Sequence, residues 1–131
     1  QNPLTLSFRN DVNLEARATG GCHDGGFVEV STNDGSSWTP VSAAQLLTTP
    51  YTGAIANGPG AGIQAWCGTL AYRRSVVNLN SYAGQTVRLR FRVTTDDAFG
   101  TTPLGWFVDD IRVQGCQPGT PNSIFTDGFQ P

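Results

Sequence analysis

The chain has 131 residues, the usual size of one domain, with 16 glycines, 8 prolines, no methionine and only 14% charged residues. Its net charge is −2 and its 8 basic residues are spread along the sequence, which argues against nucleic acid or an anionic membrane as a partner. No run approaches the roughly 18 apolar residues of a membrane span. The supply of Val, Thr, Ser and Phe favours short strands joined by turns, and we expect an all-β domain.

Three strands are expected in the first quarter of the chain. Residues Leu4 to Phe8 alternate apolar and polar side chains (LTLSF), which predicts a half-buried strand with Leu6 facing inward. A second strand is expected between Asn13 and Ala18. The run GGFVEVST, from Gly25 to Thr32, predicts a third.

A tight turn is expected directly after the third strand, in the sequence STNDGSSW from Ser31 to Trp38. Gly35 can take the positive φ that hairpin turns require. The segment is also similar to the Asp-box motif S-x-D-x-G-x-T-W, with Asn33 in the Asp place and Ser37 in the Thr place. In families that carry this box it is a structural turn remote from any active site, so we interpret the segment as a hairpin.

The middle of the chain predicts little regular structure. One helical turn is possible between Ser42 and Leu47, and a Gly/Pro-rich loop follows from Thr48 to Gly62. Loops of this length are often functional or cross-linked.

The three cysteines form no C-x-x-C pair, which argues against a zinc ribbon or a redox motif. Cys22 and Cys67 both lie in turn-like, Gly-containing surroundings, and we predict a disulfide between them that ties down long loops. Cys116 would then need a partner outside this chain or remain free. The expected disulfide also predicts secretion, because disulfides persist in oxidising environments outside the cytosol.

The clearest alternation runs from Thr86 to Thr95, after a strand expected at 74–79. Its apolar face contains Val87, Leu89, Phe91 and Val93, and its polar face contains Arg88, Arg90 and Arg92. This arginine stripe could recognise a carboxylate or an acidic sugar. The alternative is a solvated face with cross-strand partners such as Glu29 or Glu15.

The last core strand is expected at Gly105 to Val113 (GWFVDDIRV). Residues 117–131 have the composition of a linker and a short tail segment, so the domain is expected to cover residues 1–116. Seven or eight short strands without alternating helices predict an antiparallel two-sheet β-sandwich, a jelly roll.

Three phrases occur in an order that resembles a known family: DGGFVEVSTNDGSSW, LNSYAGQTVRLRFR and GWFVDDI. They are similar to the MAM-like jelly-roll modules (galactose-binding-like in architecture) of secreted bacterial peptidases of the immune-inhibitor-A type. The resemblance covers residues 4–116. It implies a non-catalytic accessory module that stabilises, orients or targets a neighbouring enzyme, often around a bound Ca²⁺.

Calcium takes about six to eight oxygen ligands, so paired acids in turns are the feature to look for. The modules that this chain resembles place calcium between an acid of the last strand and groups near the first strands. This implies a site made of Glu15, Asp24 and either Asp109 or Asp110, because neighbouring residues of one strand point to opposite faces unless the strand is bulged there. In the alternative, Asp109 and Asp110 accept from turn amides or pair with arginines. Asp96 and its neighbour Asp97 are interpreted as solvated turn residues.

The second functional hypothesis is a carbohydrate-binding module that anchors its parent enzyme on polysaccharide. Tyr51 and Trp66, near the long loop, are the candidates for an exposed sugar-stacking surface beside the arginine stripe; packing inside the loop is the alternative. His23 is the only histidine, and no motif for a nucleophile, metal hydrolase or nucleotide is present. We therefore expect no enzyme activity, and partners that are either the catalytic domain of the same parent protein or an extracellular protein or polysaccharide.

Overall fold

The computed structural model describes residues 3–96 and 105–115, and this part of the chain is built from strands. Three single 3₁₀ turns connect some of them: η1 (Ala43–Gln45), η2 (Gly58–Gly60) and η3 (Asn80–Tyr82). The strands are β1 (Leu4–Leu14), β2 (Gly25–Ser31), β3 (Thr39–Pro40), β4 (Gly53–Ala54), β5 (Gln64–Ala65), β6 (Gly68–Asn78), β7 (Arg88–Thr94) and β8 (Gly105–Gly115).

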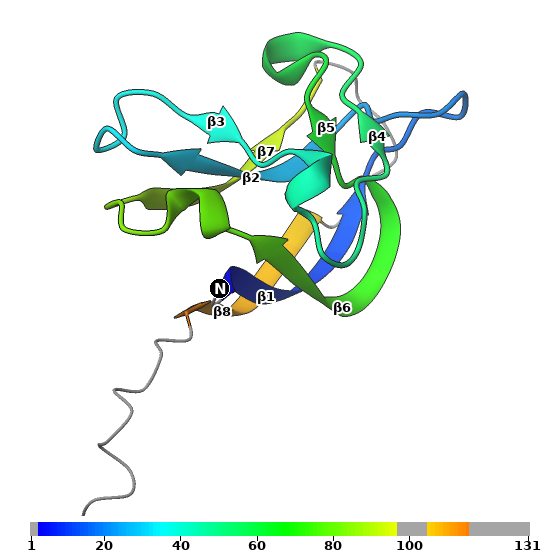
Figure 1. Ribbon diagram of the computed structural model, residues 1–131. Helices are drawn as coiled ribbons and strands as arrows, with labels where there is room; N and C mark the ends of the chain where they lie inside the picture. The colour runs from blue at the N-terminus through cyan, green and yellow to red at the C-terminus, as the bar shows by residue number, and fades with distance from the viewer. Residues whose placement is uncertain (1–2, 97–104, 116–131) are drawn as a thin grey trace, which may run out of the picture.

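The strands form two three-stranded sheets and one small ribbon. One sheet has the order β6-β1-β8, the second β3-β2-β7, and the pair β4-β5 forms the ribbon. All these pairings are antiparallel. The two larger sheets lie in separate layers, with the ribbon at one end (Figure 1). The predicted all-β fold of antiparallel sheets is confirmed, and its layering is compatible with a sandwich; the jelly-roll connectivity stays a prediction.

The first strand is longer than the sequence predicts. β1 continues without a break to Leu14, where two strands were expected, and it is the central strand of its sheet. Two register shifts accompany it, one against β8 between Ser7 and Arg9 and one against β6 between Asn10 and Val12. Each shift adds one residue to the edge strand and twists the ladder locally, so both edges can follow the long central strand.

Aromatic rings fill the space between the two sheets. Phe8, on β1, is 1% exposed and makes edge-on contacts with Trp66, Phe91 and Trp106 at centroid distances of 6.0, 5.0 and 6.4 Å. Such edge-to-face pairs contribute about 0.5–1.5 kcal/mol beyond the burial of apolar area. The indole N–H of Trp66 donates to the Thr49 carbonyl at 2.9 Å. This bond satisfies the polar atom of a fully buried ring.

The predicted hairpin joins β2 to β3. Its turn is held by side chains: Ser31 Oγ accepts from the Gly35 N–H at 2.9 Å, and Asn33 Oδ1 accepts from the Ser37 N–H at 2.9 Å. Asp34 and Gly35 have φ values of 61° and 89°, the left-handed conformation that Asp tolerates and Gly favours. Turn geometry therefore accounts for the residues that resemble an Asp box.

The predicted disulfide joins Cys22 to Cys67, which are 45 residues apart. It pins the β1–β2 loop onto the β4-β5 ribbon, where Cys22 N donates to the Ala54 carbonyl at 2.9 Å. Gly21 makes this approach possible, because it has a φ of 86° and a Cβ at its position would lie 2.8 Å from Ala54 O. Both half-cystines are buried.

Replacing both cysteines in the variant Cys22→Ala/Cys67→Ala should lower the free energy of unfolding by about 2–5 kcal/mol, because the unfolded chain loses a long cross-linked loop. Urea denaturation of the variant and of the oxidised wild-type protein measures the difference. A loss below about 1 kcal/mol would show that this bridge does not constrain the fold.

Candidate metal centre

Three carboxylates meet at the end of the molecule where the β1–β2 loop enters β2. Glu15, Asp24 and Asp96 each have a carboxylate oxygen within 4.8 Å of the other two. Asp24 is 8% exposed, and Glu15 and Asp96 are half-buried. Like charges about 4 Å apart repel by roughly 4 kcal/mol at the effective dielectric of a protein surface, so the group is suited to a cation.

Main-chain hydrogen bonds hold the three residues together. The Glu15 carbonyl accepts from the N–H groups of His23 and Asp24 at 2.9 and 3.0 Å, which closes the β1–β2 loop. The Asp96 N–H, directly after β7, donates to Asp24 Oδ1 at 3.0 Å. Backbone from three separate parts of the chain therefore sets the positions of these carboxylates.

The ligand atoms of this group favour a hard cation. They are carboxylate oxygens, which Ca²⁺ and Mg²⁺ prefer, and the nearest sulfur atoms are in the disulfide. Three carboxylates with water or backbone oxygens would meet the roughly six to eight ligands that Ca²⁺ takes. His23 lies beside the group, with Nδ1 3.1 Å from Asp96 Oδ2, and the two form an ion pair when the imidazole is protonated. The residues present therefore fit calcium.

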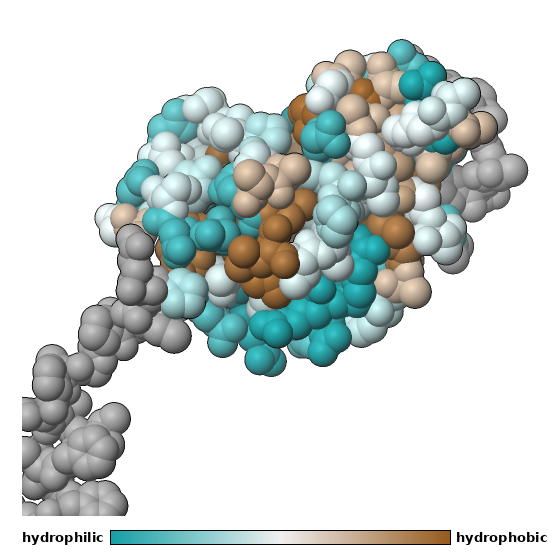
Figure 2. Space-filling model, turned by 45° about the vertical axis from the view of Figure 1, so that its right-hand side comes forward, coloured by the Kyte–Doolittle hydropathy of each residue, from teal (hydrophilic) through white to brown (hydrophobic). Residues whose placement is uncertain are grey.

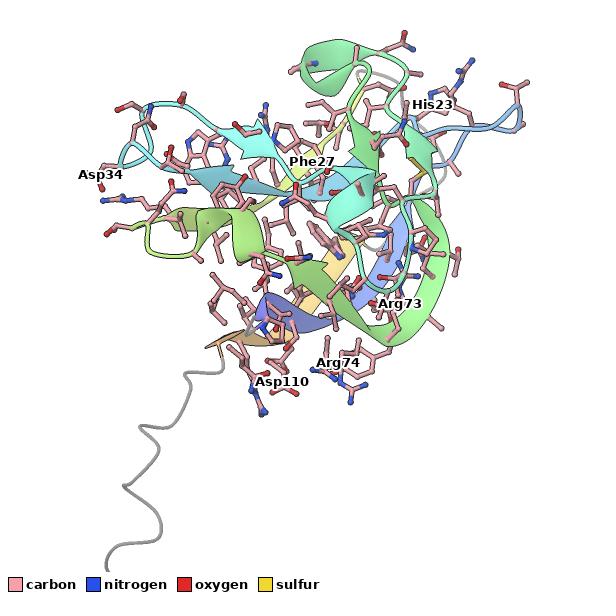
Figure 3. The ribbon with its side chains drawn as sticks, in the orientation of Figure 1. His23, Phe27, Asp34, Arg73, Arg74 and Asp110 are labelled. Carbon is pink, nitrogen blue, oxygen red and sulfur yellow. A yellow bond between two sulfur atoms is a disulfide. The ribbon has the colours of Figure 1, made fainter. Side chains whose placement is uncertain are left out.

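The structure brings together only two of the four acids predicted as ligands. Glu15 and Asp24 belong to the group, whereas Asp109 and Asp110 lie on β8 and are exposed. Asp109 is opposite Arg9 in the β1–β8 ladder. Arg9 is six positions before Glu15, a distance of roughly 20 Å along a strand, so Asp109 is far from the acidic group. Asp110 lies below the β6-β1-β8 sheet, and His23, beside the acidic group, lies at the other end of the molecule (Figure 3).

A β-bulge explains why neither of these two acids points into the core. Asp110 has a φ of 50°, and its N–H donates to Asp109 Oδ1 at 2.7 Å. Asp109 therefore follows the alternative in which it accepts from a turn amide. The third member of the acidic group, Asp96, was interpreted as a solvated turn residue. Its position could have indicated the site, because Asp96 is two residues after the alternating strand β7, and the end of β7 pairs with the start of β2 beside Asp24.

The aromatic platform predicted at the long loop is wrong for Trp66, which has no exposed surface. Tyr51 packs against it at a centroid distance of 4.6 Å and donates its hydroxyl to the Val41 carbonyl at 2.8 Å. Burial raises the pKa of the Tyr51 hydroxyl above its usual value. Both rings therefore belong to the packing of the domain, the alternative considered from the sequence.

The arginine stripe is used for structure. Glu29 on β2 is 2% exposed, and its two carboxylate oxygens are contacted by Arg90 and, at 3.5 Å, by Arg92. Arg90 also lies over the Trp38 ring at 4.2 Å, and Arg88 pairs with Asp34 in the hairpin turn. These cross-strand partners match the structural alternative. The stripe neutralises a buried carboxylate that would be costly to bury alone.

The described residues offer no free thiolate beside His23, because the Cys22 sulfur is in the disulfide. No helix among residues 3–96 and 105–115 has the length and hydropathy that a bilayer span requires. Cys116 and Asp97 lie outside the described residues.

Changing Arg90 to Met should lower the free energy of unfolding by about 2–3 kcal/mol, because Glu29 then keeps only its weaker partner. The loss is smaller than for a fully buried pair, since Arg90 is 38% exposed. The matched control is Arg88→Met, whose exposed ion pair should contribute less than about 0.5 kcal/mol. Equal losses in the two variants, measured by urea denaturation, would refute a special role for the Glu29 pair.

Comparisons of the chain with models of protein families, with curated proteins and with solved structures returned no match. The resemblance to MAM-like modules therefore stays a prediction. The function has to be argued from the geometry of the acidic group and of the surfaces around it.

Proposed function

We propose that this chain is a non-catalytic accessory module of a larger secreted bacterial protein, stabilised by a structural calcium ion. The observation that carries the proposal is the convergence of Glu15, Asp24 and Asp96 within 4.8 Å at the junction of the β1–β2 loop with both strands of the β2-β7 pair. A cation there joins segments that are far apart in the sequence. Its role is to hold this end of the domain together.

The disulfide supports the secreted assignment. Disulfides persist in oxidising compartments and are rare in the cytosol of most organisms. Cys22 of the bridge is two residues before Asp24, so the same loop carries the cross-link and a proposed calcium ligand. Calcium is abundant outside cells, where modules with weak calcium sites work at millimolar concentrations.

A role in contacts with a neighbouring domain is supported by the surface of β8. Ile111 and Val113 are 53 and 54% exposed. Large apolar side chains that gather on one element are typical of surfaces that meet another protein. The partner proposed is the catalytic domain of the same parent protein, which by the resemblance is a peptidase.

The test is thermal unfolding of the 131-residue chain, first in EDTA and then in millimolar Ca²⁺. Ligand at 100 times its Kd stabilises the folded state by about 2.7 kcal/mol, which is on the order of 8 °C for a domain of this size. The wild-type protein should show this rise. Asp96→Asn should abolish most of it, because one of three carboxylates is removed.

The matched control is Asp109→Asn, which removes one carboxylate of the ligand set expected from the sequence but leaves the group of three intact. It should keep the full response to calcium. The reverse pattern, with the response lost in Asp109→Asn and kept in Asp96→Asn, would overturn the proposed site. A wild-type protein that does not respond, after removal of tightly bound metal is verified, would remove calcium from the proposal.

A further inference from the structure

The outer face of the β6-β1-β8 sheet carries a second cluster of arginines, separate from the stripe on β7. A hollow of about 360 Å³ opens on this face, and its lining is mostly polar. The side chains that line it include Arg9, Arg74, Arg112, Ser7, Gln114 and Asp110. Three strands thus contribute one arginine each.

Strand register explains why these arginines gather. Arg9 on β1 is directly opposite Arg74 on β6, and Ser7, two residues before Arg9, is opposite Arg112 on β8. Residues two apart point to the same face, and neighbouring strands are about 4.8 Å apart. The three guanidinium groups therefore follow a diagonal across the sheet. Figure 3 shows Arg74 pointing away from the underside of this sheet, next to Asp110.

These arginines differ from those of β7 in their acidic partners. Within residues 3–96 and 105–115, none of Arg9, Arg74 and Arg112 makes an ion pair, whereas Arg88, Arg90 and Arg92 each make one. Asp110 is the one carboxylate among the residues that line the hollow. The lining therefore carries a net charge of +2 on a chain whose total is −2. Figure 2 shows hydrophilic residues gathered along this underside.

Two exposed aromatic side chains flank the arginines. Tyr72, two residues before Arg74, is 58% exposed, and Phe107, opposite Asp11 on β1, is 59% exposed. Asp11 is in turn two residues from Arg9, so alternation along β1 places Asp11 and Phe107 on the face of the arginines, whereas Tyr72 lies within the register shift between β6 and β1. Aromatic rings offer an apolar face to the C–H groups of a sugar ring, and guanidinium groups bind carboxylates through paired N–H donors.

We propose that this face binds an acidic polysaccharide, with Arg9, Arg74 and Arg112 contacting its carboxylates and Tyr72 and Phe107 packing against its sugar rings. A uronic-acid chain presents carboxylates at regular intervals and lies flat, which matches a diagonal of exposed arginines on an open sheet. An acidic peptide fits less well, because extended peptides bind at sheet edges through main-chain hydrogen bonds and need pockets for their side chains. This role is independent of the calcium site.

The test is native affinity electrophoresis of the 131-residue chain in gels that contain polygalacturonate, in dilute buffer. The wild-type protein should be retarded, and the retardation should fall with added salt. Arg9→Gln/Arg112→Gln should weaken binding by roughly tenfold or more, since two charge-assisted contacts are lost. Arg17→Gln/Arg88→Gln is the matched control, because it removes two exposed arginines elsewhere, and it should bind as the wild type does.

Three outcomes would overturn the proposal. They are no retardation of the wild-type protein, equal losses in the two double variants, and binding to poly-glutamate that matches or exceeds binding to polygalacturonate. The last result would assign the face to an acidic peptide. Gels with neutral dextran control for sieving, and equal melting temperatures of the double variants exclude unfolding as the cause of lost binding. Tyr72→Ala gives a second measure, because it should weaken binding to polygalacturonate without changing binding to poly-glutamate.

Discussion

The disulfide between Cys22 and Cys67 is the constraint on which the rest of the structure depends. It fastens the β1–β2 loop to the corner between β5 and β6, directly beside Trp66. Trp66 can therefore stay fully buried against Phe8, although it comes from a segment with only two-residue strands. The same cross-link fixes the start of β2, where Asp24 faces Glu15 and Asp96. The same cross-link thus adjoins both the aromatic core, through Trp66, and the candidate metal centre, through Asp24.

The charges of the domain divide into those used for folding and those left for binding. Glu29 is buried, and it takes the two arginines next to it on β7 as its partners. On the outer face of the other sheet, Arg9, Arg74 and Arg112 are exposed and make no ion pair within the described residues. The burial of one glutamate therefore decides which of the arginines, chemically alike, remain available for an anion. The candidate metal centre, marked by His23 beside it, is at a different end of the molecule (Figure 3).

Local patterns predicted β2, β7, β8 and the start of β1, because alternation and the turn at Asn33 to Gly35 depend on residues near in sequence, but they did not predict β3, β4, β5 or the first half of β6. The disulfide was also predicted, from the turn-like surroundings of its cysteines. Long-range relations were harder: Asp96 contacts Asp24 across 72 residues, and no periodic pattern indicates such a contact. The bulge at Asp110 turned two expected ligands outward, since one extra residue changes the register of a strand. For Trp66 the sequence left an exposed surface and core or loop packing both open, because flanking composition says nothing about what a loop covers.

The central claim is that Glu15, Asp24 and Asp96 form one calcium site. Its most direct test is diffraction from crystals of the chain grown with calcium chloride, with data collected at a wavelength where calcium scatters anomalously. The account predicts an anomalous peak between the three carboxylates, with oxygen ligands at about 2.3–2.6 Å. A peak beside Asp109 and Asp110, or a well-ordered site with only water between the three carboxylates, would contradict it.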